Sequence, residues 1–154
     1  MDLCNINDIK ALLARHGFRF SKSMGQNFLI EGWVPRDIAE ASGAAPGCGV
    51  LEVGPGIGTL TIALLKHAAS VIAIERDPDL PAVLADTLHP WREKFALIEK
   101  DALDVTRDDI VSVASTMVEP GGDTGCPDRA SSAANETAQW AVFSSAACVI
   151  HPRP

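Results

Sequence analysis

A glycine-rich turn is the feature of this sequence that most directly indicates a ligand site. Gly54-Pro55-Gly56-Ile57-Gly58 follows the short apolar run Val50-Leu51-Glu52-Val53 and precedes a segment with helical periodicity. Glycines let a ligand approach the backbone closely, and the free N–H groups at a helix N-terminus attract an anion. A tight turn that needs glycine only for its backbone geometry explains the same residues, and both interpretations stay open at this point.

The spacing of these glycines separates the common kinds of ligand site. A dinucleotide fingerprint has the form Gly-x-Gly-x-x-Gly, whereas the third glycine here comes one residue earlier. No Gly-Lys-Ser/Thr follows to hold a nucleoside triphosphate. A nicotinamide-dependent oxidoreductase is therefore disfavoured. The pattern Glu52-x-Gly54-x-Gly56-x-Gly58 instead resembles the first motif of S-adenosylmethionine-dependent methyltransferases.

Two acidic residues follow later strands of the expected sheet. Glu75 ends the second strand, where a carboxylate can accept hydrogen bonds from both hydroxyls of a ribose. The alternative interpretation of Glu75 is a solvated charge at the end of a strand. Asp101 follows the third strand. A carboxylate there can accept a hydrogen bond from the exocyclic amine of an adenine, or it can cap a helix. Because strand ends in a doubly wound sheet point at one crevice, we expect both acids to lie near the glycine turn.

The elements that must position these residues follow from hydrophobic periodicity. Helical spacing of apolar residues predicts a helix over about 5–16 and a second one from Pro35 to Ser42-Gly43. Strands then alternate with helices: Val50–Val53, helix Thr59–Ala69, Val71–Ile74, helix Leu80–Leu88, Phe95–Ile98 and helix Ile110–Met117. Such alternation predicts an α/β fold with a doubly wound parallel sheet. A fourth strand is predicted within 139–150, most clearly over Trp140–Phe143.

Composition narrows the class of protein. The chain has 154 residues, 47% of them apolar, which predicts a single globular unit rather than a disordered chain. Its net charge of −7 argues against general nucleic-acid binding, but residues 1–30 carry +2, so any contact with a polyanion is expected to start there. No apolar run is long enough to cross a membrane, and we expect a cytoplasmic protein. Scattered cysteines and isolated histidines predict neither a disulfide scaffold nor a metal site.

Four motifs together resemble the rRNA adenine dimethyltransferase family. They are Lys22-Ser23-Met24-Gly25-Gln26-Asn27-Phe28-Leu29, Val50 to Thr61 with its glycine turn, Ile74-Glu75-Arg76-Asp77, and Lys100-Asp101-Ala102. Gly-Gln-Asn-Phe-Leu placed about 25 residues before the glycine turn is far more specific than the turn alone. The resemblance spans about residues 16 to 117.

The resemblance implies a Rossmann-like, S-adenosylmethionine-dependent enzyme that dimethylates adenine N6 in small-subunit rRNA. Gln26, Asn27 and Leu29 would line the methionine side of the cofactor pocket. Gly54 and Gly56 would contact its backbone end, Glu75 the ribose, and Asp101 with Ala102 the adenine.

One motif of the family is absent. In the family, Asn-Leu-Pro-Tyr after the fourth strand accepts hydrogen bonds from the target amine and stacks on the base. The counterpart here is Ser145-Ala146-Ala147-Cys148, in which none of the four residues matches, so no catalytic residue is intact. A second hypothesis is therefore a catalytically inactive, truncated remnant that binds S-adenosylmethionine or RNA at most.

The chain divides on this basis into three parts. Residues 1–30 form an N-terminal helix and a segment that contacts cofactor or RNA, 31–118 form the Rossmann-like core, and 119–154 form an atypical loop, the fourth strand and a truncated end. The family continues with further strands and a helical domain, so the sheet is expected to be incomplete. An exposed sheet edge predicts self-association.

Overall fold

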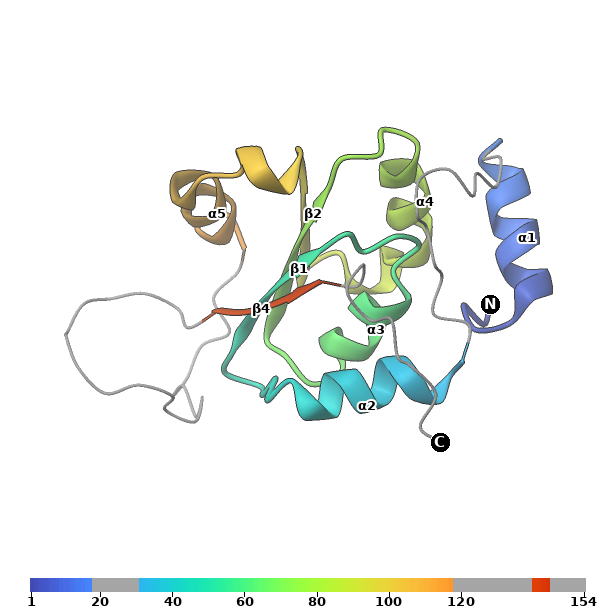
Figure 1. Cartoon of the computed structure of the whole chain (residues 1–154), viewed down its shortest axis with the longest axis horizontal. Helices are drawn as coiled ribbons and strands as arrows, with labels where there is room; N and C mark the ends of the chain where they lie inside the picture. Colours follow the sequence, from blue (N-terminus) through green and yellow to red (C-terminus); the bar gives the residue numbers. More distant parts are fainter. Residues whose placement is uncertain (18–30, 118–139, 145–154) are drawn as a thin grey trace.

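The computed structural model describes residues 1–17, 31–117 and the backbone of 140–144 (Figure 1). Helices and strands alternate through most of the chain, as the periodicity predicts. In chain order the elements are α1 (Ile6–Arg15), α2 (Trp33–Ala41), β1 (Gly49–Val53), α3 (Thr59–Leu65), β2 (Ser70–Glu75), α4 (Leu80–Thr87), the 3-10 turn η2 (His89–Trp91), β3 (Phe95–Glu99), the 3-10 turn η3 (Ala102–Asp104), α5 (Arg107–Ala114) and β4 (Trp140–Ser144).

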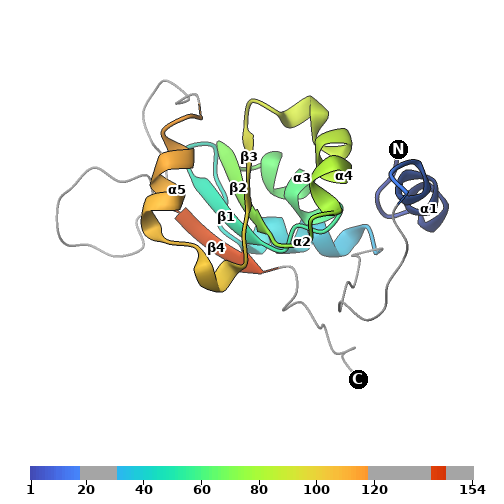
Figure 2. The same ribbon diagram turned by 90° about the horizontal axis from the view of Figure 1, so that it is seen from above.

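The four strands form one parallel sheet in the order β3-β2-β1-β4. The chain moves outward from β1 to β3 and then returns to place β4 on the other side of β1. Figure 2 shows α5 on one face of the sheet and α2, α3 and α4 on the opposite face. This arrangement confirms the expected doubly wound α/β fold, and its topological switch point lies between β1 and β4.

Each face of the sheet has its own apolar core. On one face, Val50 and Val71 pack with the buried sides of three helices, whose fully buried members include Ala39, Leu64 and Leu84. On the other face, Leu51, Ile72, Ile74 and Ile98 meet the partly buried side chains of α5. Successive strand residues alternate between these cores, so the apolar runs predicted from sequence are strands that are covered on both faces.

Three elements differ in extent from the sequence prediction. The helix expected over 59–69 ends at Leu65, because the N–H of Ala69 already donates to the carbonyl of Cys48 and the chain has returned to the sheet. Helix α5 begins earlier than expected, at Arg107, where Thr106 and Asp109 form a capping box. The fourth strand covers Trp140–Ser144 and, among the described residues, lies at the edge of the sheet beside β1.

Two further expectations concern the covalent structure and the sheet edge. Cys48, directly before β1, is disulfide-bonded, whereas the scattered cysteines predicted no disulfide scaffold. Within the described residues β4 pairs with β1 alone, so its other edge has no neighbouring strand there. Self-association through that edge stays a prediction.

Gly58, the last glycine of the turn, is expected to be a sensitive position for stability. Its φ of +89° is unfavourable for residues with a side chain, and a Cβ there would lie 3.2 Å from both Leu88 Cδ2 and Thr87 Oγ1. Gly58→Ala should lower the free energy of unfolding by about 2 to 4 kcal/mol, through the left-handed conformation and the crowding. Urea unfolding measures this loss.

Gly43→Ala is the matched control for that substitution. Gly43 also has a positive φ, +74°, but nothing lies within 4 Å of the point that a Cβ would occupy there. The free energy of unfolding of this variant should fall by only about 1 to 2 kcal/mol, the cost of the left-handed backbone conformation without the crowding. Equal losses in the two variants would show that α4 does not pack against the turn as the structure has it.

Candidate functional site

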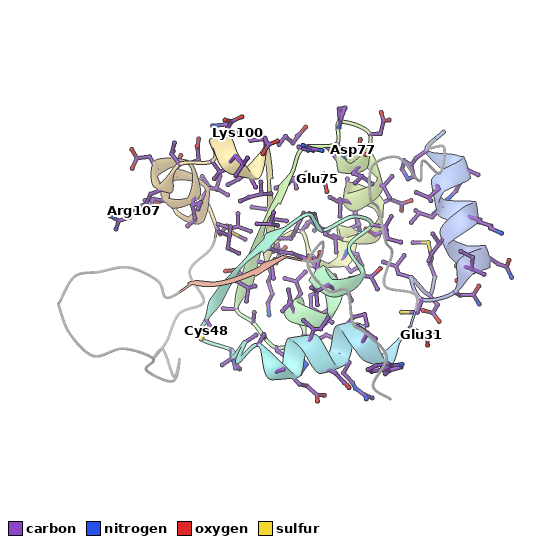
Figure 3. The ribbon with its side chains drawn as sticks, in the orientation of Figure 1. Glu31, Cys48, Glu75, Asp77, Lys100 and Arg107 are labelled. Carbon is purple, nitrogen blue, oxygen red and sulfur yellow. The ribbon has the colours of Figure 1, made fainter. Side chains whose placement is uncertain are left out.

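The glycine turn and the two predicted acids lie at the carboxyl edge of three adjacent strands. Val53 pairs with Ile74, and Glu75 pairs with Glu99, so β1, β2 and β3 end side by side. The glycine turn leaves β1, Glu75 ends β2, and Asp101 comes two residues after β3. Figure 3 shows Glu75, Asp77 and Lys100 at this same edge. Crevices for ligands in such sheets form there, beside the switch point.

The glycine turn is compact and requires its glycines. Gly54, Gly56 and Gly58 all have positive φ angles, of 71°, 60° and 89°. The N–H of Gly54 donates to the carbonyl of Ile74 at 2.9 Å, which ties the turn to β2. Backbone geometry therefore explains why glycines occupy all three positions. A contact of Gly54 and Gly56 with a ligand remains a prediction that this geometry allows.

Glu75 is nearly buried, and backbone groups hold its carboxylate. Its Oε1 accepts hydrogen bonds from the N–H groups of Arg76 and Asp77, each at 2.9 Å. Burial raises the pKa of Glu75, while the backbone N–H groups of Asp77, Arg76 and Gly56 act in the opposite direction. The side chain is thus not the freely solvated charge that was one alternative, and it joins the loop after β2 to the glycine turn.

Asp101 both caps a turn and links two strand ends. Its Oδ1 accepts from the N–H of Leu103 at 3.0 Å, which confirms the capping role that the sequence allowed. Its Oδ2 accepts from Nη1 of Arg76 at 3.2 Å, across the edge of the sheet. These two donors hold the pKa of Asp101 below its ordinary value. Ala102, the other residue predicted for an adenine contact, is exposed in η3.

Glu52 is a site residue that the sequence prediction missed. It is fully buried in β1, and Thr61 Oγ1 donates to its Oε2 at 2.7 Å. Its Oε1 has no hydrogen-bond partner among the described residues, and neither has the buried Oγ1 of Thr59. Burial, with a smaller contribution from the charge of Glu75, raises the pKa of Glu52 to about 7, although the Thr61 hydrogen bond opposes this. The signal in the sequence was a single charged residue inside an apolar strand.

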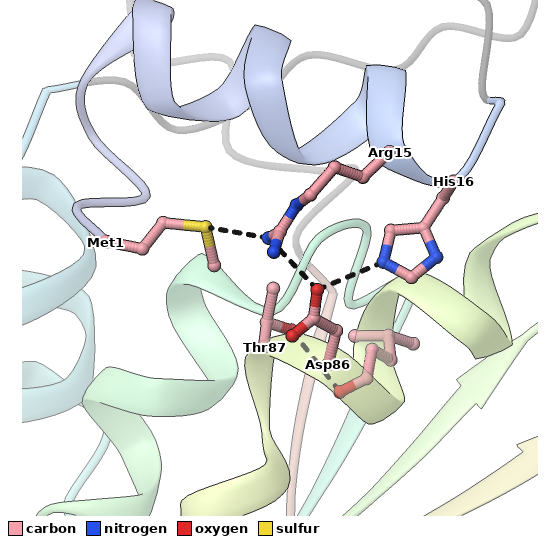
Figure 4. Close-up of polar contacts among 6 residues, drawn as sticks. Met1, Arg15, His16, Asp86 and Thr87 are labelled. Atoms are coloured by element: carbon pink, nitrogen blue, oxygen red, sulfur yellow. Dashed lines mark hydrogen bonds and ion pairs between the residues drawn. The ribbon is translucent and has the colours of Figure 1, made fainter.

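Helix α1 packs against the other side of the turn and α4. Ile9, Leu12 and Leu13 bury their side chains against Ile57 of the turn and the apolar face of α4. Asp86 of α4 binds Arg15 at 3.0 Å and His16 at 3.1 Å, as Figure 4 shows. Helix α1 thereby fixes where the chain enters the segment that carries the Gly-Gln-Asn-Phe-Leu motif.

Seven predicted site residues lie outside the residues that the structure describes. They are Gln26, Asn27, Leu29, Ser145, Ala146, Ala147 and Cys148. Within the described ranges, no cluster of three metal-binding side chains occurs. The helices of that same part of the chain include none with the length and apolarity to span a bilayer.

Comparison with known proteins identifies relatives by sequence. The chain is 48% identical over 113 residues to the Ribosomal RNA small subunit methyltransferase A of Clostridium perfringens, an alignment that covers 72% of this chain and 39% of that protein. It is 56% identical over 80 residues to the protein of the same name from Deinococcus radiodurans, covering 52% of this chain and 27% of the relative. The chain thus matches about two fifths or less of the length of these relatives.

A solved structure and a family model complete the comparison. The crystal structure of the 23S rRNA methyltransferase ErmE shares 27% identity, with a TM-score of 0.49 over 60% of this chain and 44% of that one. The model of the Ribosomal RNA adenine dimethylase family matches residues 17–122, which is more than half of the chain. That match includes the glycine turn, Glu75 and Asp101, and it shows that the chain belongs to the ribosomal RNA adenine dimethylase family.

Proposed function

We propose that this chain binds S-adenosylmethionine and is the cofactor-binding part of an rRNA adenine-N6,N6-dimethyltransferase. The observation that carries the proposal is the meeting of the glycine turn, Glu75 and Asp101 at the ends of three adjacent strands. In a doubly wound sheet this edge is where a nucleoside-containing ligand binds. Family membership, with relatives that carry the name of a methyltransferase, supports the same activity.

Each part of the cofactor has a candidate partner at this edge. Gly54 and Gly56 accommodate the methionine part, and Glu75 accepts hydrogen bonds from the ribose hydroxyls. Asp101 accepts a hydrogen bond from the exocyclic amine of the adenine, and Ala102, the next residue, also contacts the adenine. Gln26, Asn27 and Leu29 would close the methionine side. When bound, the cofactor supplies a methyl group on a positively charged sulfur, which an amine nitrogen can attack.

The chemistry of the site fits this cofactor. The two proposed acceptors, Glu75 at the end of β2 and Asp101 after β3, are carboxylates, and the turn after the neighbouring strand β1 carries no side chain at Gly54 or Gly56. Glu52 Oε1, buried two residues before Gly54 and lacking a partner among the described residues, is a further acceptor under the turn. A polar atom that is buried without a partner is costly, so it marks a place that a donor would stabilise.

The proposed substrate is adenine in small-subunit rRNA, in the cytoplasm. The names of the relatives support small-subunit rRNA as the substrate, and the description of the family supports adenine as the methylated base. Residues 1–30 carry a net charge of +2 in a chain with −7 overall, so contact with the rRNA backbone is expected to begin in this segment.

Glu75→Gln tests the cofactor site. The amide keeps the size of the side chain but removes the charge from the ribose acceptor, so the affinity for S-adenosylmethionine should fall about tenfold. Isothermal calorimetry measures the dissociation constant. Glu99→Gln is the matched control, because Glu99 pairs with Glu75 in register on β3 but is exposed. Equal affinities in Glu75→Gln and the unmodified chain would exclude Glu75 as the ribose acceptor.

A second candidate function is cofactor or RNA binding without methyl transfer. The observation in its favour is the sequence Ser145-Ala146-Ala147-Cys148, which stands where the family has Asn-Leu-Pro-Tyr. Cofactor binding alone does not separate the two functions, whereas an assay of methyl transfer does.

A further inference from the structure

The glycine turn packs against two helices. Ile57, which lies between Gly56 and Gly58, is fully buried in one apolar cluster with side chains of α1 and α4. Helix α4 also approaches Gly58 so closely that a Cβ there would lie 3.2 Å from Leu88 Cδ2 and Thr87 Oγ1. The position of the turn therefore depends on both helices.

Helix α1 depends in turn on the same cluster. It has ten residues, and a helix shorter than about 12 residues is marginal in water by itself. Asp86 of α4 holds its carboxyl end, through Arg15 at 3.0 Å and His16 at 3.1 Å (Figure 4). The buried side chains of the helix supply the rest of its attachment, and they are Ile9, Leu12 and Leu13. Undocking of α1 and loss of its helical structure are therefore expected to occur together.

We propose that α1 positions the glycine turn for the cofactor, so that docking of α1 and binding of S-adenosylmethionine are coupled. The inference rests on the proposed function. It makes Leu12 and Asp86 positioning residues, which act on the turn through Ile57 and do not touch the cofactor.

The physical reason is the conformational freedom of the turn. Gly54 and Gly56 have φ angles of 71° and 60°, and glycine has many other backbone conformations available. While Ile57 is packed in the cluster with α1, the turn is held in one conformation before the cofactor arrives. Without α1, the cofactor must order the turn as it binds, and this loss of entropy lowers its affinity.

Such a coupling acts equally in both directions. If docked α1 strengthens cofactor binding by a given factor, bound cofactor must stabilise the docked helix by the same factor. We expect about tenfold, or about 1.4 kcal/mol, which is comparable to the cost of fixing the backbone of one residue. A helix that only adds to the stability of the fold shows no such relation.

Hydrogen exchange with and without S-adenosylhomocysteine measures one direction. In the unmodified chain, the ligand should slow exchange of the α1 amides at 10–13 about tenfold more than exchange of the α2 amides at 37–41. Without ligand, Asp86→Asn should speed exchange in α1 about 3- to 10-fold, because it weakens both bonds at the end of the helix. Asp37→Asn is the matched control, since Asp37 is likewise exposed and pairs with Arg36 at 3.1 Å, but on α2.

Calorimetry on Leu12→Ala measures the other direction. Removal of this buried side chain favours undocked α1, so the affinity for S-adenosylhomocysteine should fall about tenfold, the same factor as in the exchange experiment. Leu65→Ala is the control, because Leu65 is equally buried but belongs to a different apolar cluster from Ile57. Its affinity should stay within about threefold of that of the unmodified chain. Circular dichroism checks that both variants are folded.

The outcomes separate this inference from the proposed function. If the unmodified chain binds no S-adenosylhomocysteine, both are wrong. If it binds, equal slowing of exchange in α1 and α2 overturns the coupling alone, as does an unchanged affinity of folded Leu12→Ala. Should Leu12→Ala fail to fold, exchange in the unmodified chain and in Asp86→Asn decides, because neither experiment needs that variant.

Discussion

The free energy of unfolding is expected to fall by up to about 3 kcal/mol as the pH rises from 4.5 to about 7, because Glu52 is buried. Its ordinary pKa is 4.5, and burial in the folded chain raises that pKa to about 7. Within this range the folded chain holds a proton on Glu52 that the unfolded chain has released. Each increase in pH therefore favours unfolding, and the loss is complete once the pH exceeds the folded pKa.

Urea unfolding at several pH values between 4.5 and 8 measures this dependence. Glu52→Gln removes the titrating group at nearly the same size, so its stability should vary far less over this range. Some dependence will remain, because burial also raises the pKa of Glu75. Three acids have lowered pKa values: Asp86, Asp101 and Asp109. They increase the free energy of unfolding as the pH rises, but they do so at a lower pH than Glu52. A curve for Glu52→Gln parallel to that of the unmodified chain would contradict the assignment.

The sequence predicts the order of the elements and the edge where the site lies. Short apolar runs followed by glycine or an acid define β1 and β2, and a parallel sheet then brings their carboxyl ends together. This is why Gly54, Glu75 and Asp101 could be selected as site residues from their positions alone. Helix ends are less predictable, because α3 stops where Ala69 must meet Cys48, a contact set by the strand register.

The features of the site that depend on three-dimensional packing were not predictable. Glu52 is an acid in a short strand, and its burial becomes evident only when Thr61 of α3 lies over it. Asp101 was compatible with a cap or a ligand contact, and the cap bond uses only one of its two oxygens. The ion pair between Arg76 and Asp101 joins residues 25 positions apart, and it requires β2 and β3 to be neighbours.

Methyl transfer to rRNA by this chain is expected to be at least about 100-fold slower than transfer by a relative with an intact Asn-Leu-Pro-Tyr. Strand β4 ends at Ser144, which pairs with Val53 beside the glycine turn, and positions 145–148 follow it in sequence. By resemblance these positions are expected to orient the target amine. Ser145 can form one hydrogen bond, but Ala147 lacks the constraint of proline and Cys148 cannot stack on a base.

Transfer of a labelled methyl group from S-adenosylmethionine to undermethylated small ribosomal subunits measures the rate, with a relative that carries Asn-Leu-Pro-Tyr assayed beside this chain. The informative variant carries S145N, A146L, A147P and C148Y. It leaves Glu75 and Asp101 in place, so its cofactor affinity should not change, whereas any methyl transfer it gains comes from orientation of the adenine. Transfer by the unmodified chain at a rate near that of the relative would show that another group positions the amine. In that case the four substitutions should not increase the rate, since the base would already be held by residues outside this motif.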